Sequence, residues 1–292
     1  MIKTVSPQLP SLPPAIPAQV AGAIAEDLGP GDVTAALVPA DATARARVIS
    51  REPGVLCGTA WVDETFSAVS GGQIHVHWHL GDGERCDTDT PLCEIEGPAR
   101  ALLTAERTAL NFLQTLSGTA TAARRYVDAL GDDATCRLLD TRKTLPGLRL
   151  AQKYAVRCGG GANHRIGLFD GVLIKENHIA AGGGIAPTVA AARAERSSLA
   201  VEVEVESLDE LSQAMAAGAD IAMLDNFTLE DMRTAVARVR DAQHPMRLEA
   251  SGDITLDNAA QVAATGVDFI SIGALTKHVR ALDLSLRILE VS

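Results

Sequence analysis

The chain from about residue 199 to residue 273 alternates between short apolar stretches and longer stretches of helical period. Strand-like stretches at 199–205, 220–226, 246–252 and 267–273 alternate with helix-like stretches at 207–219, 228–242 and 255–266. Each strand-helix unit takes roughly 20–25 residues, a pattern that predicts a parallel sheet covered by helices. Further strands are expected upstream, at 135–143 and 170–178. These strands suffice for a closed or nearly closed α/β barrel.

The ends of the predicted helices carry the expected signals. Ser207, Thr228 and Thr255 stand where an N-cap is needed, because their hydroxyl oxygens can accept from the first free N–H groups of a helix. Gly218 and Gly266 stand where two of these helices should end.

The first 115 residues or so show a different pattern. Short strands are expected at 44–50, 54–58, 73–80 and 91–97, with helices near 61–69 and 99–116. This mixture predicts an α+β domain. Ser117 and Gly118 mark the expected junction with the barrel, and a second helix at 119–130 would bridge the two parts.

Composition excludes several classes of protein. The 292 residues include 37 acidic and 26 basic side chains, a net charge of −11, which argues against nucleic acid or an anionic membrane as the main partner. No apolar run approaches the roughly 20 residues that cross a bilayer. The proline-rich start lacks the apolar core of a signal peptide, so we expect an irregular arm on a cytoplasmic protein. The five cysteines show no CxxC spacing and are expected to be plain thiols.

Candidate functional residues lie at the ends of the predicted barrel strands, where a parallel barrel places its functional groups. They are Arg142, Lys143, Lys175, Glu204, Asp225, Ser251, Gly252 and Gly273.

Valine and glutamate alternate along 201–206, so Glu202, Glu204 and Glu206 share one face of a strand that a barrel would normally bury on both faces. Buried without partners, these charges would be costly. Lys143 and Lys175, at the ends of other strands, could pair with them inside the barrel mouth. Alternatively, this strand lies at the edge of the sheet and its glutamates are solvated.

Cations concentrate in two segments, TRKT at 141–144 and GGGANHRIG at 159–167. Arg142, Lys143, His164 and Arg165 would form a receptor for an anion such as a carboxylate or phosphate. Ordinary surface loops are the alternative. The triple glycine is only a weak phosphate-binding signal, because it matches neither specific glycine-rich fingerprint.

Two further segments are candidates for ligand binding. Small residues at 250–255 and 272–276 leave backbone N–H groups where many barrels bind phosphate. His75, His77 and His79 alternate along one strand and could hold a metal, but no carboxylate or cysteine partner is near, so a solvated strand face is favoured.

Seven dispersed motifs resemble the quinolinate phosphoribosyltransferase family: LDTRKT, GGGANHR, LIKENHI, EVEVES, MLDNF, LEASGDI and ISIGALTKH. The stretches EDLGPGDVTAALVP and TAERTALNFLQTLSGTAT resemble it as well. The similarity runs in order from about Glu26 to Leu289 and leaves out the first twenty residues.

The resemblance implies an N-terminal α/β sandwich domain at 1–117 that includes the proline-rich arm. It further implies an incomplete, open α/β barrel of the TIM-like type at 118–276, and a segment at 277–292 that packs back on the first domain. It also implies an obligate homodimer with sites at the subunit interface, sometimes a hexamer. The implied reaction converts quinolinate and phosphoribosyl pyrophosphate (PRPP) to nicotinate mononucleotide, pyrophosphate and CO2, with Mg2+, in NAD biosynthesis.

The resemblance also assigns roles to residues. Arg142, His164 and Arg165 would hold the quinolinate carboxylates, with Arg107 from the partner subunit. Lys143 and Lys175 would face PRPP and its pyrophosphate. Glu204 and Asp225 would face the ribose hydroxyls and Mg2+, and Ser251, Gly252 and Gly273 the 5′-phosphate.

Two other functions remain open on sequence. A Schiff-base aldolase on the same barrel would use Lys143 or Lys175 as its nucleophile. A non-catalytic relative that only binds a metabolite would have lost Arg107, Glu204 or Asp225, and all three are present.

Overall fold

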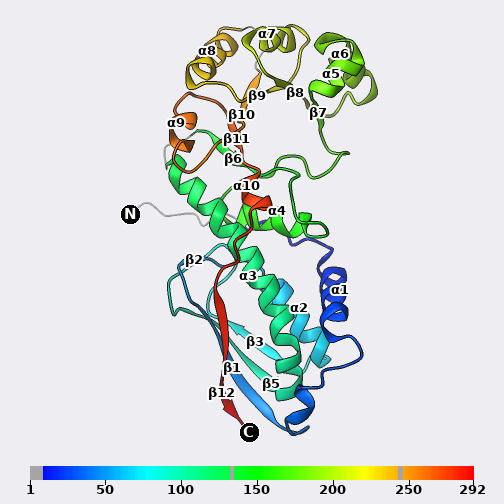
Figure 1. Cartoon of the computed structure of the whole chain (residues 1–292), viewed down its shortest axis with the longest axis vertical. Helices are drawn as coiled ribbons and strands as arrows, with labels where there is room; N and C mark the ends of the chain where they lie inside the picture. The colour runs from blue at the N-terminus through cyan, green and yellow to red at the C-terminus, as the bar shows by residue number, and fades with distance from the viewer. Residues whose placement is uncertain (1–8, 132–134, 243–245) are drawn as a thin grey trace. The chain divides into compact units, whose positions relative to one another are not determined.

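The computed structural model describes residues 9–131, 135–242 and 246–292 and divides into two compact units (Figure 1). The first unit combines 1–124, 144–160 and 275–292, and the second combines 125–143 and 161–274. The segment 144–160, which the sequence analysis placed with the barrel, thus groups with the amino-terminal residues. The predicted domain limits at residues 117 and 276 stay predictions.

A four-stranded antiparallel sheet organises the first unit, in the order β12-β1-β5-β3. Its strands are β1 (Thr43–Ser50), β3 (His75–Trp78), β5 (Pro91–Pro98) and β12 (Leu284–Val291). Every second residue of β1 is buried, and its Val48 shares a core with Phe66 of α2 (Thr59–Ser70) and Leu102 of α3 (Ala99–Leu130). The carboxyl-terminal strand β12 pairs with β1, so both ends of the chain contribute to this unit.

Helix α3 is one helix where two were predicted, at 99–116 and 119–130, because it runs through Ser117 and Gly118 without a break. Both residues are buried in packing contacts. The Ser117 hydroxyl donates to the Cys57 carbonyl and accepts from the Cys57 N–H at 2.9 Å. A Cβ on Gly118 would collide with the Arg280 carbonyl oxygen. Small residues are needed here for close approach of the backbone, and they do not end the helix.

Smaller elements complete the first unit. They are α1 (Ile16–Leu28), η1 (Ala35–Leu37), β2 (Gly54–Val55), β4 (Arg85–Cys86), α4 (Arg149–Cys158) and α10 (Ala274–Lys277), the last of which begins in the second unit. Side chains of α1, α3 and α4, among them Tyr154, form a second core with Trp61 of α2. Residues 1–8 of the predicted arm lie outside the described residues.

The second unit is an open α/β barrel, as predicted, built on a six-stranded parallel sheet in the order β6-β11-β10-β9-β8-β7. Its strands are β6 (Arg137–Leu139), β7 (Val172–Ile174), β8 (Val201–Val205), β9 (Ile221–Asp225), β10 (Arg247–Ser251) and β11 (Phe269–Ser271). Its helices are α5 (Glu176–Gly182), α6 (Ile185–Glu195), α7 (Leu208–Ala216), α8 (Leu229–Arg240) and α9 (Ala259–Ala263).

The predicted helix starts are confirmed at two of three positions. The side chains of Ser207 and Thr228 accept from the N–H groups three residues later, at the starts of α7 and α8. Thr255 is not an N-cap. The chain makes a turn at 256–258, and α9 begins only at Ala259, after Asn258.

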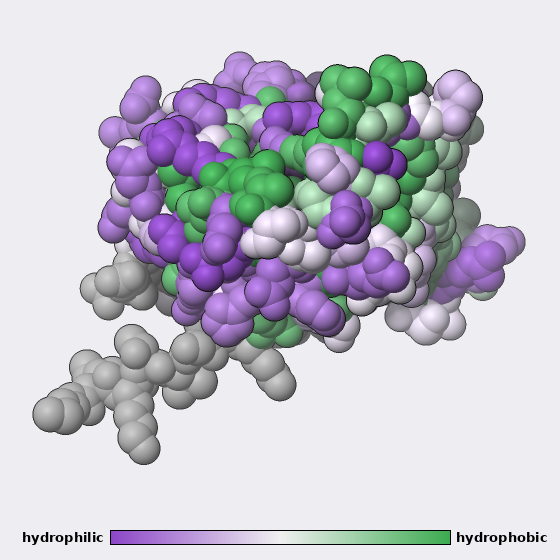
Figure 2. Space-filling view, turned by 90° about the horizontal axis from the view of Figure 1, so that it is seen from below, coloured by the Kyte–Doolittle hydropathy of each residue, from purple (hydrophilic) through white to green (hydrophobic). Residues whose placement is uncertain are grey.

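The molecular surface is mixed in polarity (Figure 2), and the cysteines are free thiols as predicted. Figure 2 shows apolar side chains reaching the surface between polar ones on the face that it views. All five cysteines are buried free thiols. Among the described residues, no helix combines the length and the apolar character needed to cross a bilayer.

Candidate active site

The carboxyl ends of the barrel strands surround a pocket of about 310 Å3. Eight residues predicted from the sequence line it together: Arg142, Lys143, His164, Arg165, Lys175, Glu204, Asp225 and Ser251. The predicted gathering of charged residues at one end of the barrel is therefore confirmed. Thr141, Leu173, Met223, Glu249 and Ser271 complete the lining.

The loop that carries His164 and Arg165 is held by a buried aspartate. Asp140 follows β6 directly and is fully buried. Its carboxylate accepts from the His164 N–H at 2.9 Å and from the Asn163 side-chain amide at 2.6 Å. Arg165 in turn donates from Nη1 to the Gly171 carbonyl. These contacts hold the His164 main chain at the end of β6 and the Arg165 guanidinium beside the start of β7.

Arg142 and Arg165 bring two guanidinium groups into one pocket. Burial and the nearby positive charge of Arg142 lower the pKa of Arg165 below its usual value. Repulsion of this kind between like charges makes an anion a favourable occupant of the space that both face.

Lys175 pairs with Glu204 across neighbouring strands. Lys175 directly follows β7, Glu204 lies on β8, and the ammonium contacts the carboxylate Oε2. Burial raises the pKa of Glu204, whereas its contact with Lys175 lowers it and the Asp225 charge raises it further. Because β8 lies between β7 and β9, the alternative of a solvated edge strand is wrong.

Asp225 ends β9 beside a strained turn. The next residue, Asn226, has φ of 55°, and its side-chain amide donates to Asp225 Oδ2 at 3.0 Å. The Asn226 N–H donates to the Ser251 carbonyl at the end of β10. A Cβ on Gly252 would collide with Asn226 Oδ1, so a glycine is needed for this close approach.

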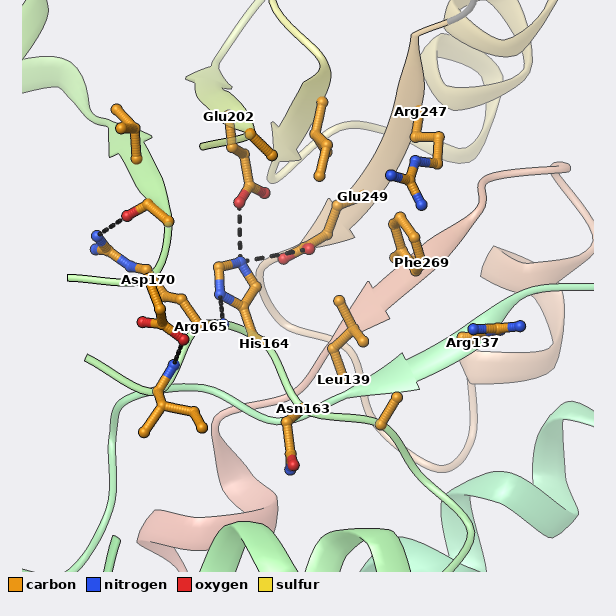
Figure 3. A pocket seen from close by; sticks show the side chains of 16 residues that line it. Arg137, Leu139, Asn163, His164, Arg165, Asp170, Glu202, Arg247, Glu249 and Phe269 are labelled. Atoms are coloured by element: carbon orange, nitrogen blue, oxygen red, sulfur yellow. Dashed lines mark hydrogen bonds and ion pairs between the residues drawn. The ribbon is translucent and has the colours of Figure 1, made fainter. Parts of the chain in front are cut away.

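His164 lies against two buried carboxyl groups inside the barrel (Figure 3). Its Nε2 is 2.9 Å from Glu202 Oε2 and 3.6 Å from Glu249 Oε2, and its Nδ1 accepts from the Arg165 N–H at 2.7 Å. Burial, and next the Glu202 charge, raise the pKa of Glu249 to about 8. Glu249 was not among the residues predicted from the sequence.

A second cavity, of about 450 Å3, lies at the amino ends of the same strands (Figure 3). Arg137, Glu202, Ile221, Arg247 and Phe269 line it, and the Arg247 guanidinium lies over the Phe269 ring at 5.4 Å. His164, Arg165 and Glu249 line this cavity and the first pocket alike.

Three predicted site residues do not line the pocket. Gly252 lies in the turn described above, and Gly273 lies beside the Lys143 side chain, where a Cβ would be 3.0 Å from Lys143 Cδ. Arg107 lies on α3 of the first unit and is exposed. The exposed His75, His77 and His79 belong to no metal-ligand group among the described residues.

Two groups of three residues have the spacing of metal ligands within the described ranges. In one, Cys57, Asp82 and Cys158, the aspartate already accepts from two backbone N–H groups and from the Tyr154 hydroxyl, and burial raises the pKa of Cys57. The other is His164, Glu202 and Glu249. Glu204 and Asp225 form a separate pair of oxygen donors in the pocket, of the type that Mg2+ prefers.

An open α/β barrel with clustered cations and two carboxylates at the carboxyl ends of its strands defines a class of enzymes that act on anionic substrates. Comparison with known proteins identifies the family. Residues 119–287 match the C-terminal domain of quinolinate phosphoribosyl transferase, and residues 32–117 match its N-terminal domain. The chain belongs to the quinolinate phosphoribosyltransferase family, as the resemblance predicted.

Known relatives cover nearly the whole chain. The nicotinate-nucleotide pyrophosphorylase [carboxylating] of Mycobacterium leprae is 46% identical over 272 residues, which are 90% of this chain and 94% of the relative. The human protein of the same name is 41% identical over 280 residues, 95% of this chain and 93% of the relative. The structure of the nicotinate-nucleotide pyrophosphorylase from Francisella tularensis superposes with a TM-score of 0.91 at 48% identity, covering 95% of this chain and 98% of that one.

Proposed function

We propose that this protein transfers the phosphoribosyl group of PRPP to the ring nitrogen of quinolinate, with release of pyrophosphate and CO2 and formation of nicotinate mononucleotide. The main support is the pocket in which Arg142, Lys143, Arg165 and Lys175 lie with Glu204 and Asp225. Relatives that cover nine tenths of the chain carry the name of this carboxylating enzyme. The proposed place of the reaction is NAD biosynthesis.

Both substrates are polyanions, and the pocket offers cations to each. Arg142 and Arg165 are suited to quinolinate, because guanidinium groups match carboxylates in bidentate geometry. Lys143 and Lys175 are suited to PRPP and its pyrophosphate. The backbone around Ser251, Gly252 and Gly273, free of large side chains, is suited to the 5′-phosphate.

Glu204 and Asp225 serve the reacting ribose in this proposal. Cleavage at the anomeric carbon builds positive charge on the sugar, which nearby carboxylates stabilise. The same oxygens fit Mg2+, which when bound would offset the negative charge of the leaving pyrophosphate. Lys143 and Lys175 would stabilise the same negative charge on the leaving pyrophosphate.

No protein nucleophile is needed. Once the ring nitrogen carries the ribose, its positive charge can stabilise the electron pair left on the neighbouring ring carbon when CO2 departs, and a proton then takes the place of the lost carboxylate. The aldolase alternative requires an uncharged, desolvated lysine. The contact of Lys175 with Glu204 disfavours that role, since an ion-paired ammonium is not a nucleophile.

The proposed enzyme is a homodimer, further assembled into a hexamer in some members of the family, and Arg107 of the partner completes each pocket. Large apolar side chains are exposed on both units, among them Val33 at 85% and Phe169 at 75%, as expected of surfaces that another subunit covers. The five free cysteines fit a reducing compartment, and we propose the cytoplasm.

The decisive experiment mixes the protein with Mg2+, PRPP and quinolinate labelled in its ring carboxyl groups, and measures released CO2. We expect release that depends on PRPP. Nicotinate, which has one carboxylate, should be the poorer acceptor, because the pocket holds more cation than one carboxylate needs. Equal or better turnover of nicotinate would contradict the assignment.

A further inference from the structure

The proposed reaction consumes one proton at the ring carbon that loses CO2. When the bond to the carboxylate breaks, its electron pair stays on that carbon. A proton must then form a bond with this pair, because otherwise the pair returns to CO2 and the carboxylate forms again. An acid that keeps its proton at neutral pH and reaches that carbon would supply it.

Glu249 lies where such an acid is needed. It is in the middle of β10, is only 1% exposed, and lines both the pocket and the cavity at the amino ends of the strands. Arg165, one of the two guanidinium groups suited to quinolinate, lines the same two cavities. A carboxylate that Arg165 binds therefore lies at the inner end of the pocket, on the side of Glu249.

Glu249 shares the barrel interior with a second buried carboxyl group, that of Glu202. One oxygen of each group lies within 4.8 Å of the other, and Figure 3 shows both side chains reaching toward His164. The His164 Nε2 is 2.9 Å from Glu202, within hydrogen-bond distance, but 3.6 Å from Glu249, outside it. Two buried carboxyl groups so close together are not both ionised, and the nearer histidine favours charge on Glu202. Glu249 therefore keeps the proton, in agreement with its raised pKa.

The other acids and cations of the pocket have roles that conflict with donating this proton. Glu204 and Asp225 must be ionised in order to stabilise the ribose cation and to hold Mg2+. The Lys175 ammonium contacts Glu204, which stabilises its charged form. Lys143 and Lys175 face the pyrophosphate, which leaves from the side of the ribose opposite to the ring nitrogen.

We propose that Glu249 is the general acid of the decarboxylation step and donates its proton to the ring carbon as CO2 departs. The inference rests on the proposed function, because the proton is needed only if quinolinate loses a carboxylate here. The C–C bond breaks, a C–H bond forms with the electron pair left behind, and Glu249 becomes a carboxylate. Its charge then lies beside that of Glu202, which favours rapid uptake of a new proton.

The cavity behind Glu249 provides a route for that new proton. It has a volume of about 450 Å3, and the exposed Arg137 and Arg247 line it, so it is open to solvent at the amino ends of the strands. Water fits a polar cavity of this size. Glu249 is thus reprotonated from this side while substrate or product still fills the pocket.

The test separates the two chemical steps in a single turnover, with Glu249→Gln and the control Glu206→Gln. Glu206 follows β8 and is exposed. Glutamine has nearly the shape of a protonated glutamate but is no acid, so Glu249→Gln should release pyrophosphate within about threefold of the wild-type rate. Its CO2 release should slow roughly 100-fold or more, and the nucleotide that still carries both carboxylates should accumulate. Glu206→Gln should release both products in equal amounts, at the wild-type rate.

A second measurement needs no turnover. Infrared difference spectra between the wild type and Glu249→Gln, at pH 7 with and without Mg2+, should show the band of a protonated carboxyl group that the variant lacks. A wild type without this band would overturn the inference, since Glu249 would have no proton to donate. Loss of the band on adding Mg2+ would overturn it as well, because a metal ion would then occupy the carboxyl group.

The outcomes distinguish the inference from the proposed function. A wild type that releases neither pyrophosphate nor CO2 contradicts the proposed function. If the wild type is active, an unchanged rate of CO2 release in Glu249→Gln contradicts the inference alone and indicates that another group, such as His164, is the donor. Equal slowing of pyrophosphate and CO2 release would also overturn the inference, because Glu249 would then act in binding or in folding.

Discussion

Three glutamates inside the barrel differ in chemistry because their neighbours differ. Glu204 lies at the pocket and contacts the Lys175 ammonium, so a charged carboxylate is stabilised there. Glu202 accepts a hydrogen bond from His164. Glu249 is 1% exposed, and burial beside the Glu202 charge holds its pKa near 8. Residue type alone therefore does not decide the charge state at neutral pH.

The raised pKa of Glu249 predicts a pH-dependent cost of folding. The folded protein keeps a proton that the unfolded chain releases above about pH 4.5, so stability from this group falls between about pH 4.5 and pH 8. Glu249→Gln should remove this fall in the free energy of unfolding. Between pH 5 and pH 8 the stability of the variant relative to the wild type should therefore rise by up to a few kcal/mol. Denaturant unfolding at pH 5 and at pH 8 measures the free energy of unfolding of each protein. Glu290→Gln, at an exposed position, is the control.

Arg165→Ala should weaken quinolinate binding by about 1.5–3 kcal/mol, the usual range for a charged hydrogen bond, and leave PRPP binding nearly intact. The physical reason is that Arg165 shares its pocket with Arg142, a pairing suited to a dicarboxylate. Titration calorimetry with each substrate measures the change. Arg233→Ala, exposed on α8, is the matched control. The opposite pattern would assign Arg165 to the phosphates.

The sequence predicted the pocket residues that directly end strands, because parallel topology brings strand ends together whatever the details of packing. This argument did not predict Glu249. It lies in the middle of β10 between Leu248 and Ala250, and its one signal in the sequence is a glutamate between two apolar residues of a predicted strand. The lysines were expected to compensate the glutamates of β8. Lys175 does so for Glu204, but the partner of Glu202 is His164 from a distant loop, which no local pattern reveals.

At the scale of elements, periodicity predicted the strands and helices of the second unit, since each must bury one side. The prediction was wrong at α3, where Ser117 and Gly118 were interpreted as a break between two helices. Small residues have two uses, to end a helix and to let backbones approach, and the local sequence does not distinguish them. The Arg280 carbonyl that requires Gly118 comes from the other end of the chain.

Gly118→Ala should therefore destabilise the protein by about 1–3 kcal/mol, as overpacking typically does, despite the better helix propensity of alanine. The added Cβ would collide with the Arg280 backbone. The matched control is Gly22→Ala in α1, where a Cβ meets nothing within 4 Å and stability should rise by up to about 1 kcal/mol. Thermal and denaturant unfolding compare the two variants. A gain in both would show that the α3 contact is unimportant.

The adjacent strands β8 and β9 carry Glu204 and Asp225, the two carboxylates of the pocket that are proposed to face the ribose. Asp225→Ala should depress turnover strongly while quinolinate affinity without PRPP changes little, because the proposed partners of Asp225 are the ribose and Mg2+. Steady-state kinetics and calorimetry separate the two effects. Asp231→Ala, on α8, is a control for loss of an aspartate outside the pocket. Full activity of Asp225→Ala would refute the role.

At the scale of the whole molecule, an acidic protein with a net charge of −11 concentrates cations in one pocket. The negative charge elsewhere disfavours nonspecific binding of nucleic acid and other anions, so an anionic ligand is favoured only where the cations gather. The proposed partner residue Arg107 would add a further cation from another subunit.

Subunit mixing tests that proposal. Arg107 lies on α3 of the first unit, whereas Arg142 lines the pocket of the second. If each pocket takes Arg107 from the partner, Arg107→Ala and Arg142→Ala proteins, each inactive alone, should regain activity when their subunits exchange. In the mixed dimer one pocket carries both changes and the other carries neither, so up to about half of the native activity per mixed dimer should return. Exchange is verified with subunits of two different masses. Verified exchange without recovery of activity would mean that Arg107 acts in the pocket of its own chain or has no part in the reaction.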